Sequence, residues 1–112
     1  MKLRIWQIPA IPSSGRFTVP VTSVLEAAKM SVLLAMYDKY QVTHGAKPDA
    51  FNAGGTEMLL DNAEKWVPFE LTDSWDETFD DPIAYILNSG DVSAETRKEF
   101  SEFNQSFSGG NI

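Results

Sequence analysis

The segment from residue 23 to about residue 40 constrains the fold more than any other part of this 112-residue chain. Ser23 and Glu26 have the spacing of a capping box, in which the serine hydroxyl accepts the backbone N–H of the glutamate and the glutamate reaches back to the cap N–H. The sequence therefore predicts that a long helix begins at Ser23.

Apolar residues cover most of the circumference of this helix. The predicted core-facing arc contains Leu25, Ala28, Val32, Leu33, Met36 and Tyr40. Further apolar residues extend this surface, so that the side facing water holds mainly Ala27, Ser31 and Asp38. A helix of this kind needs a second cover, from the C-terminal segment or from a second subunit, and we expect a homodimer.

Two pairs of alternating segments flank the helix. Before it, residues 2–8 and 16–21 alternate between apolar and polar side chains, and Pro20 places the second segment at a sheet edge. After it, residues 56–60 and 65–71 predict a second hairpin. The order β-β-α-β-β indicates an α+β fold, in which the two β-hairpins form an antiparallel sheet packed against the long helix.

Two shorter helices are expected at the C-terminal end. Asp81 is an N-cap followed by Pro82 at the first helical position, and Gly90 is expected to end this helix. Residues 91–93 open the last helix. The length predicts a single domain of residues 1–107, with residues 108–112 as a flexible tail.

The composition excludes several classes of function. Without cysteine there are no disulfides, thiolate metal sites or cysteine nucleophiles, and the single histidine, His44, is better explained as a cap of the long helix than as a catalytic group. Gly54 and Gly55 lack the spacing of a phosphate-binding loop and are interpreted as a tight bend. We expect no enzymatic activity, no cofactor and no metal.

The net charge of −7 argues against binding to a nucleic-acid backbone or to anionic lipid. No signal peptide and no apolar run long enough to span a membrane is present, which predicts a cytoplasmic protein. The charge is uneven, because residues 51–112 hold three basic and thirteen acidic residues, a balance of −10.

The acidic residues are densest between residues 73 and 81. We expect a loop that keeps Trp75 and Phe79 on the body of the domain while its carboxylates face water. A calcium site would need the spacing of an EF-hand, which is absent, and no pair of carboxylates is distinguished as a glycosidase pair. A carboxylate array could also mimic nucleic acid and occupy the basic groove of a nucleic-acid-binding protein.

The last helix carries a stripe of three phenylalanines, which either closes the apolar side of the domain or docks on a partner. Together with the acidic segment it supplies the candidate partner-binding residues: Asp73, Trp75, Asp76, Glu77, Asp80, Asp81, Phe100, Phe103 and Phe107.

A series of short segments carries a resemblance to a known family. They are KLRIWQIP at residues 2–9, FTVPV at 17–21, AMYDKY at 35–40, KPD at 47–49 and NAGG at 52–55. In this order they resemble small proteins of tailed bacteriophages that are sometimes labelled superinfection exclusion proteins. The resemblance covers about residues 2–70, so the chain from Thr72 onward is expected to be particular to this protein.

The resemblance implies a phage-encoded, non-enzymatic accessory protein. It would act in the cytoplasm of the infected bacterium by binding a host or phage protein, with superinfection exclusion as the biological role. The alternative is an acidic inhibitor that mimics nucleic acid, as the charge of the second half allows.

Overall fold

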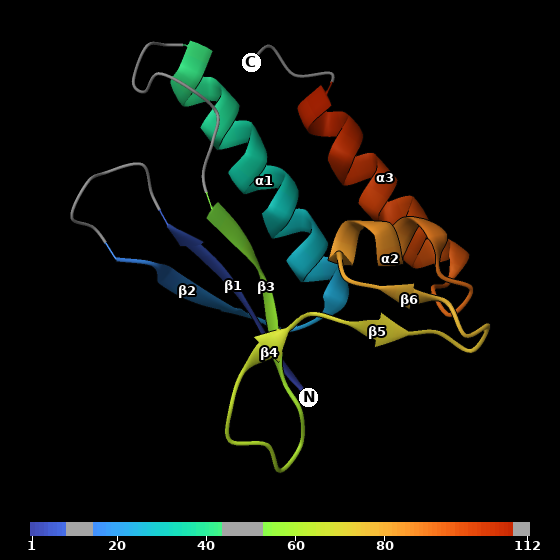
Figure 1. The fold of residues 1–112 in the computed structure, drawn as a ribbon. Coiled ribbons are helices and arrows are strands. Elements are labelled where there is room, and N and C mark those ends of the chain that lie inside the picture. Colours follow the sequence, from blue (N-terminus) through green and yellow to red (C-terminus); the bar gives the residue numbers. More distant parts are fainter. Residues whose placement is uncertain (9–14, 44–52, 109–112) are drawn as a thin grey trace.

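A computed structural model describes residues 1–8, 15–43 and 53–108 and shows a mixed α and β architecture (Figure 1). In chain order the elements are β1 (Lys2–Ile8), β2 (Phe17–Val21), α1 (Val24–Thr43), β3 (Ala53–Leu59), β4 (Val67–Pro68), β5 (Leu71–Thr72), β6 (Thr78–Phe79), α2 (Pro82–Asn88) and α3 (Ala94–Ser108). The predicted cap His44 and residues 109–112 of the predicted tail lie outside the described residues.

The main sheet has four antiparallel strands in the order β2-β1-β3-β4. The first strand is central, because Leu3 pairs with Val21 of β2 on one side and with Met58 of β3 on the other. The two predicted hairpins therefore join into one antiparallel sheet, as expected. Pro20 lies in β2, which is an edge strand as predicted.

The expectation of one continuous strand over residues 65–71 is wrong. Strand β4 holds only Val67–Pro68, and Leu71–Thr72 forms β5, which pairs with β6 in a separate two-stranded sheet. The backbone N–H of Phe69 still donates to Thr56 O at 2.9 Å, while its side chain, 1% exposed, packs in the core. Pro68 has no N–H to extend the ladder, and the chain then leaves the main sheet.

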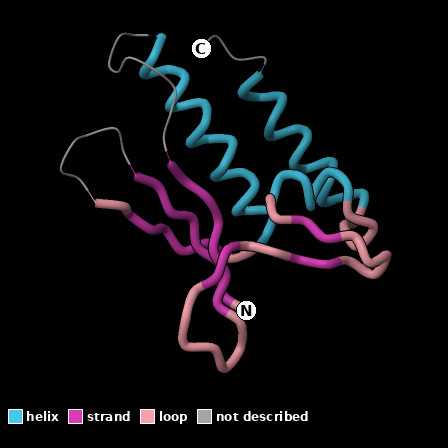
Figure 2. The backbone as a smooth tube through the Cα atoms, in the orientation of Figure 1, coloured by secondary structure: helices cyan, strands magenta, loops and turns pink. Residues whose placement is uncertain are grey.

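Helix α1 is covered on two sides, and the second cover is the C-terminal segment (Figures 1 and 2). On one side, Ala27 packs in a cluster with the inward-facing side chains of the main sheet and with Phe69. On the other side, Ala28 packs against Ile86 of α2 and Phe100 of α3. The three layers are the main sheet, α1, and the pair of α2 and α3.

Because α1 is covered on two sides, the side of the helix that faces water differs from the predicted one. Ala27, expected in water, is fully buried, whereas Leu33 and Tyr40, expected in the core, are 40% and 46% exposed. The sheet and the C-terminal helices contact α1 along two adjoining stripes, since Val24 packs against both clusters, and Leu33, Tyr37 and Tyr40 remain exposed. Periodicity alone does not show where the two contacts fall.

The predicted helix starts are confirmed by their caps. Ser23 Oγ accepts the N–H of Glu26 at 3.0 Å, as the capping box predicts. The Glu26 carboxylate, predicted to accept the N–H of the cap residue, instead accepts the Thr22 hydroxyl at 2.7 Å. Asp81 Oδ1 accepts the N–H of Ile83 at 3.0 Å and thereby caps α2. Ser89 is the C-cap of α2, one residue before the predicted terminator Gly90.

We predict that Phe100→Ala destabilises the domain by about 3–5 kcal/mol, because it removes a fully buried ring where three helices meet. This loss is comparable with the whole stability of a small domain, about 5–15 kcal/mol. The matched control is Phe103→Ala, since Phe103 is only half-buried. Urea unfolding monitored by circular dichroism measures both, and equal losses would contradict the assignment of Phe100 to the core.

Candidate functional site

A tight turn joins β5 to β6, and we call residues 73–77 the Trp75 loop. Asp73 organises it, because Asp73 Oδ1 accepts the backbone N–H groups of Trp75 at 2.9 Å and Glu77 at 3.0 Å. Asp73 Oδ2 accepts the Ser89 hydroxyl at 3.2 Å and the Gly90 N–H at 3.3 Å. One carboxylate thus closes the turn and ties it to the end of α2.

Asp73 is 5% exposed, so the structure places this predicted partner-binding residue in the interior rather than in water. Burial raises the pKa of the Asp73 carboxyl, but hydrogen bonds from the backbone N–H groups of Glu77, Trp75 and Gly90 and from the Ser89 hydroxyl lower it by more. The net pKa lies below the ordinary value, and the carboxylate stays ionised near neutral pH.

Trp75 is 80% exposed, and the expectation that it lies on the body of the domain is wrong. Asp73 takes the inward position of the turn, and the hydrogen bond to its carboxylate holds the Trp75 backbone at the surface. The indole rests against Gly90, where a Cβ would lie 2.7 Å from Trp75 Nε1. A hydrogen bond from Ser74 N–H to Asp91 Oδ2 at 3.1 Å holds the other side of the loop.

The remaining candidate residues of the acidic segment divide by role. Asp76, at φ 61°, and Glu77 are exposed in the loop, and Asp80 is exposed just after β6. Asp81 is the N-cap of α2. Phe79 is 7% exposed, which confirms the expectation that it is buried.

The phenylalanine stripe of α3 does not form one surface. Phe100 is 1% exposed and closes the apolar side of the domain. Phe103 is half-buried, with Lys29 Nζ 5.4 Å from its ring centroid. The side chain of Phe107 lies outside what the structure describes.

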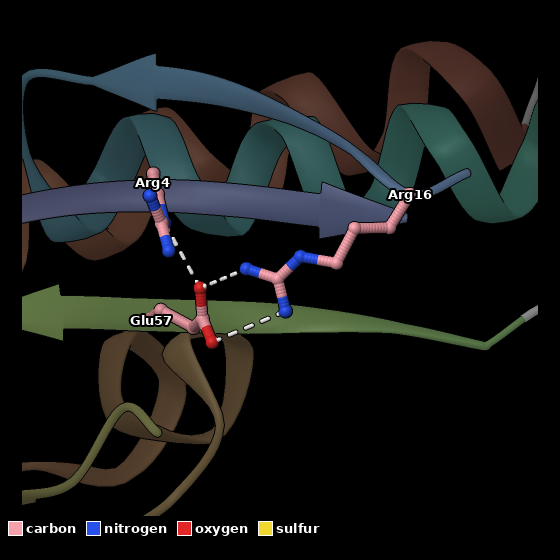
Figure 3. Close-up of polar contacts among 3 residues, drawn as sticks. All are labelled: Arg4, Arg16 and Glu57. Carbon is pink, nitrogen blue, oxygen red and sulfur yellow. Dashed lines mark hydrogen bonds and ion pairs between the residues drawn. The ribbon is translucent and has the colours of Figure 1, made fainter. Parts of the chain in front are cut away.

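A second polar cluster lies on the face of the main sheet that points away from α1 (Figure 3). Glu57 stands between two guanidinium groups, since its Oε1 accepts Arg4 Nε at 2.9 Å and Arg16 Nη2 at 2.6 Å. Arg4 Cζ lies 4.1 Å from the ring centroid of Trp66, and Arg16 Cζ lies 5.1 Å from that of Trp6. The cluster links β1 and β3 to the residues just before β2 and β4.

Sequence reasoning missed this cluster because it depends on strand register. Arg4 and Glu57 are 53 residues apart and become neighbours because β1 pairs with β3. In the same register Trp6 pairs with Gly55, where a Cβ would lie 3.1 Å from Trp6 Nε1. The predicted bend at Gly54 and Gly55 is therefore wrong, since both lie within β3 and Gly55 gives room for the Trp6 indole.

The part of the chain that the structure describes contains neither a cluster of metal-ligating side chains nor a membrane-spanning helix. Within it, no three acidic or histidine side chains gather as a group that could hold a metal ion. Over the same residues, none of the helices combines the length and the apolar character that crossing a membrane requires.

Comparison with known proteins identifies the family. The model of the family described as superinfection exclusion gene product 17 matches residues 2–98. The chain belongs to this phage protein family. It is 37% identical over 94 residues to a superinfection exclusion protein of Salmonella phage P22, an alignment that covers 77% of this chain and 90% of the relative. No solved structure matches the chain.

The family match extends beyond the resemblance seen in the sequence segments of residues 2–70. It includes the Trp75 loop, α2 and the first residues of α3. The expectation that everything from Thr72 onward is particular to this protein is therefore wrong. Phe100, Phe103 and Phe107 lie beyond the matched residues of the superinfection exclusion family.

We predict that Asp73→Asn lowers the thermal stability of the domain and loosens the Trp75 loop, because an amide nitrogen then faces the Ser89 hydroxyl or the backbone N–H donors. The folded-state pKa of Asp73 is depressed, so its contribution is present above the ordinary aspartate value of 3.8 and is lost as the pH falls through the folded-state pKa. The difference in Tm between wild type and variant should therefore shrink in acid. Asp76→Asn, at an exposed position, is the control, and a pH-independent difference at Asp73 would contradict this role.

We predict that Glu57→Gln destabilises the domain by about 1–2 kcal/mol, because two guanidinium groups lose their shared carboxylate. Burial raises the pKa of Glu57, but hydrogen bonds from Arg16 and Arg4 and the charges of both lower it by more. The stabilisation is therefore present above the ordinary value of 4.5 and fades as the pH falls. Urea unfolding measures the loss, and Glu64→Gln on the exposed turn should change little.

Proposed function

We propose that this protein acts in superinfection exclusion as a non-enzymatic binding protein, and that the Trp75 loop is the surface that contacts a host or phage protein. Its membership of the superinfection exclusion family and the name of the P22 relative, a superinfection exclusion protein, support the biological role. The single observation that carries the binding surface is Trp75, 80% exposed on a loop within the family match.

An exposed tryptophan on a fixed loop is well suited to bind a protein. Its ring buries a large apolar area on contact, and tryptophan is enriched among the residues that carry most of the binding energy in interfaces. The backbone of the loop is already held by Asp73 and by the bond from Ser74 to Asp91. Little conformational entropy is then lost from this loop on association, which favours affinity.

The second candidate function is inhibition by mimicry of nucleic acid. The observation that favours it is the run from Trp66 to Thr96, which contains eight acidic residues and no lysine or arginine. A mimic would depend on its carboxylates and not on an indole ring, because the groove it fills recognises phosphate charge. The two functions therefore differ in how they respond to the loss of Trp75.

We predict that Trp75→Ala abolishes most of the exclusion activity while the domain stays folded, because the indole contacts little of the domain. Loss of a central tryptophan from an interface removes about 2 kcal/mol or more of binding free energy. The measurement is the plating efficiency of a second phage on cells that produce the variant. Tyr37→Ala on α1, 57% exposed, is the matched control. Exclusion by Trp75→Ala at the wild-type level would contradict the proposed surface.

A further inference from the structure

Resting on the proposed function, we infer that the partner receives the Trp75 indole in an apolar pocket with a rim of lysine and arginine side chains. The Trp75 loop presents the exposed carboxylates of Asp76 and Glu77 directly after one exposed aromatic ring, and Asp80 is exposed at the end of the same hairpin. A complementary partner surface must supply both apolar area and positive charge.

Among the described residues, the acidic side chains near Trp75 in sequence have no ion-pair partner. The segment from Trp66 to Thr96 contains eight acidic residues and no lysine or arginine. None of the eight takes part in the ion pairs found among the described residues. The nearest arginine in sequence, Arg97, is turned inward, where its Nε donates to Ile86 O at 3.1 Å and its Nη2 to Ser89 O at 2.8 Å.

Three of these eight carboxylates have structural roles within the domain, and three others are placed to meet a partner. Asp73 is buried in the turn, Asp81 caps α2, and Asp91 accepts from Ser74. The exposed acidic residues that have none of these structural roles on the β5–β6 hairpin and its end are Asp76, Glu77 and Asp80. Asp76 and Glu77 follow Trp75 directly in the loop and Asp80 follows β6 of the same hairpin, so a partner that receives the indole meets carboxylates on the loop beside it.

The negative charge of the Trp75 loop also disfavours other classes of partner. Nucleic acid and anionic membranes repel this surface. A second copy of the chain offers arginines on its open sheet face, but Arg4 and Arg16 are already paired with Glu57 and stacked on tryptophan rings. Docking a second acidic loop there would have to break those contacts. A different protein with a basic rim fits better.

The partner is identified with the full chain in infected cells. A Trp75→p-benzoylphenylalanine variant is irradiated, and mass spectrometry maps the crosslinked peptide. We expect a single protein whose crosslinked residue is apolar and is surrounded by lysine and arginine. A crosslink to a second copy of the chain, to nucleic acid or to a neutral or acidic protein surface would overturn the inference.

The purified crosslinked protein then serves as the probe in binding measurements. We expect Trp75→Ala to weaken binding by about 30-fold or more. Neutralising the rim with Asp76→Asn, Glu77→Gln and Asp80→Asn together should weaken binding by about tenfold, mainly through slower association, and should reduce its dependence on salt. The matched control removes the same charge outside this run, with Glu64→Gln, Glu99→Gln and Glu102→Gln, and should change binding by less than about threefold.

The outcomes separate this inference from the proposed function. If Trp75→Ala loses both binding and exclusion while the neutralised rim binds with wild-type affinity and salt dependence, the basic rim is wrong and the proposed function stands. If Trp75→Ala binds and excludes as wild type does, both fail. Circular dichroism and Tm of each variant establish that a loss of binding is not a loss of fold.

Discussion

The burial of α1 on two sides is the interaction on which the rest of the structure depends. Ala27 and Ala28 are consecutive and both fully buried, yet one faces the main sheet and the other faces α2 and α3. Their small side chains let the backbone of α1 approach both neighbours closely. A single helix thereby joins the two halves of the chain into one packed unit, without a disulfide.

The position of the Trp75 loop follows from this packing. Ile86 fixes α2 against α1, and Ser89 at the end of α2 is fully buried. Ser89 and Gly90 then donate to Asp73, whose other oxygen holds the turn. The exposed ring of Trp75 is thus connected to the core through one carboxylate. This connection explains how an apolar side chain can stand at the surface in a defined position.

The face of the main sheet without a helix is stabilised differently. Arg4, Arg16 and Glu57 form an ion cluster across three strands or their ends, and two tryptophan rings cover the guanidinium groups. Such contacts shield the apolar surface of the outer face and favour one register between β1 and β3. The Trp75 loop remains the more accessible of the two surfaces, since its indole stands free of such partners.

Local signals in the sequence determined the helix starts, the alternating strands and the antiparallel α+β class, because caps and alternation depend on residues a few positions apart. The sequence also predicted exposed carboxylates in the acidic segment, and Asp76, Glu77 and Asp80 are exposed, whereas Asp73 is buried. Tertiary contacts decided the rest: Phe69 entered the core and divided the predicted strand, two covers turned Ala27 inward, and Asp73 took the buried position that left Trp75 in water. Arg4 met Glu57 only through the register of distant strands. These outcomes depend on which segments compete for the same interior space, and that competition is absent from any short stretch of sequence.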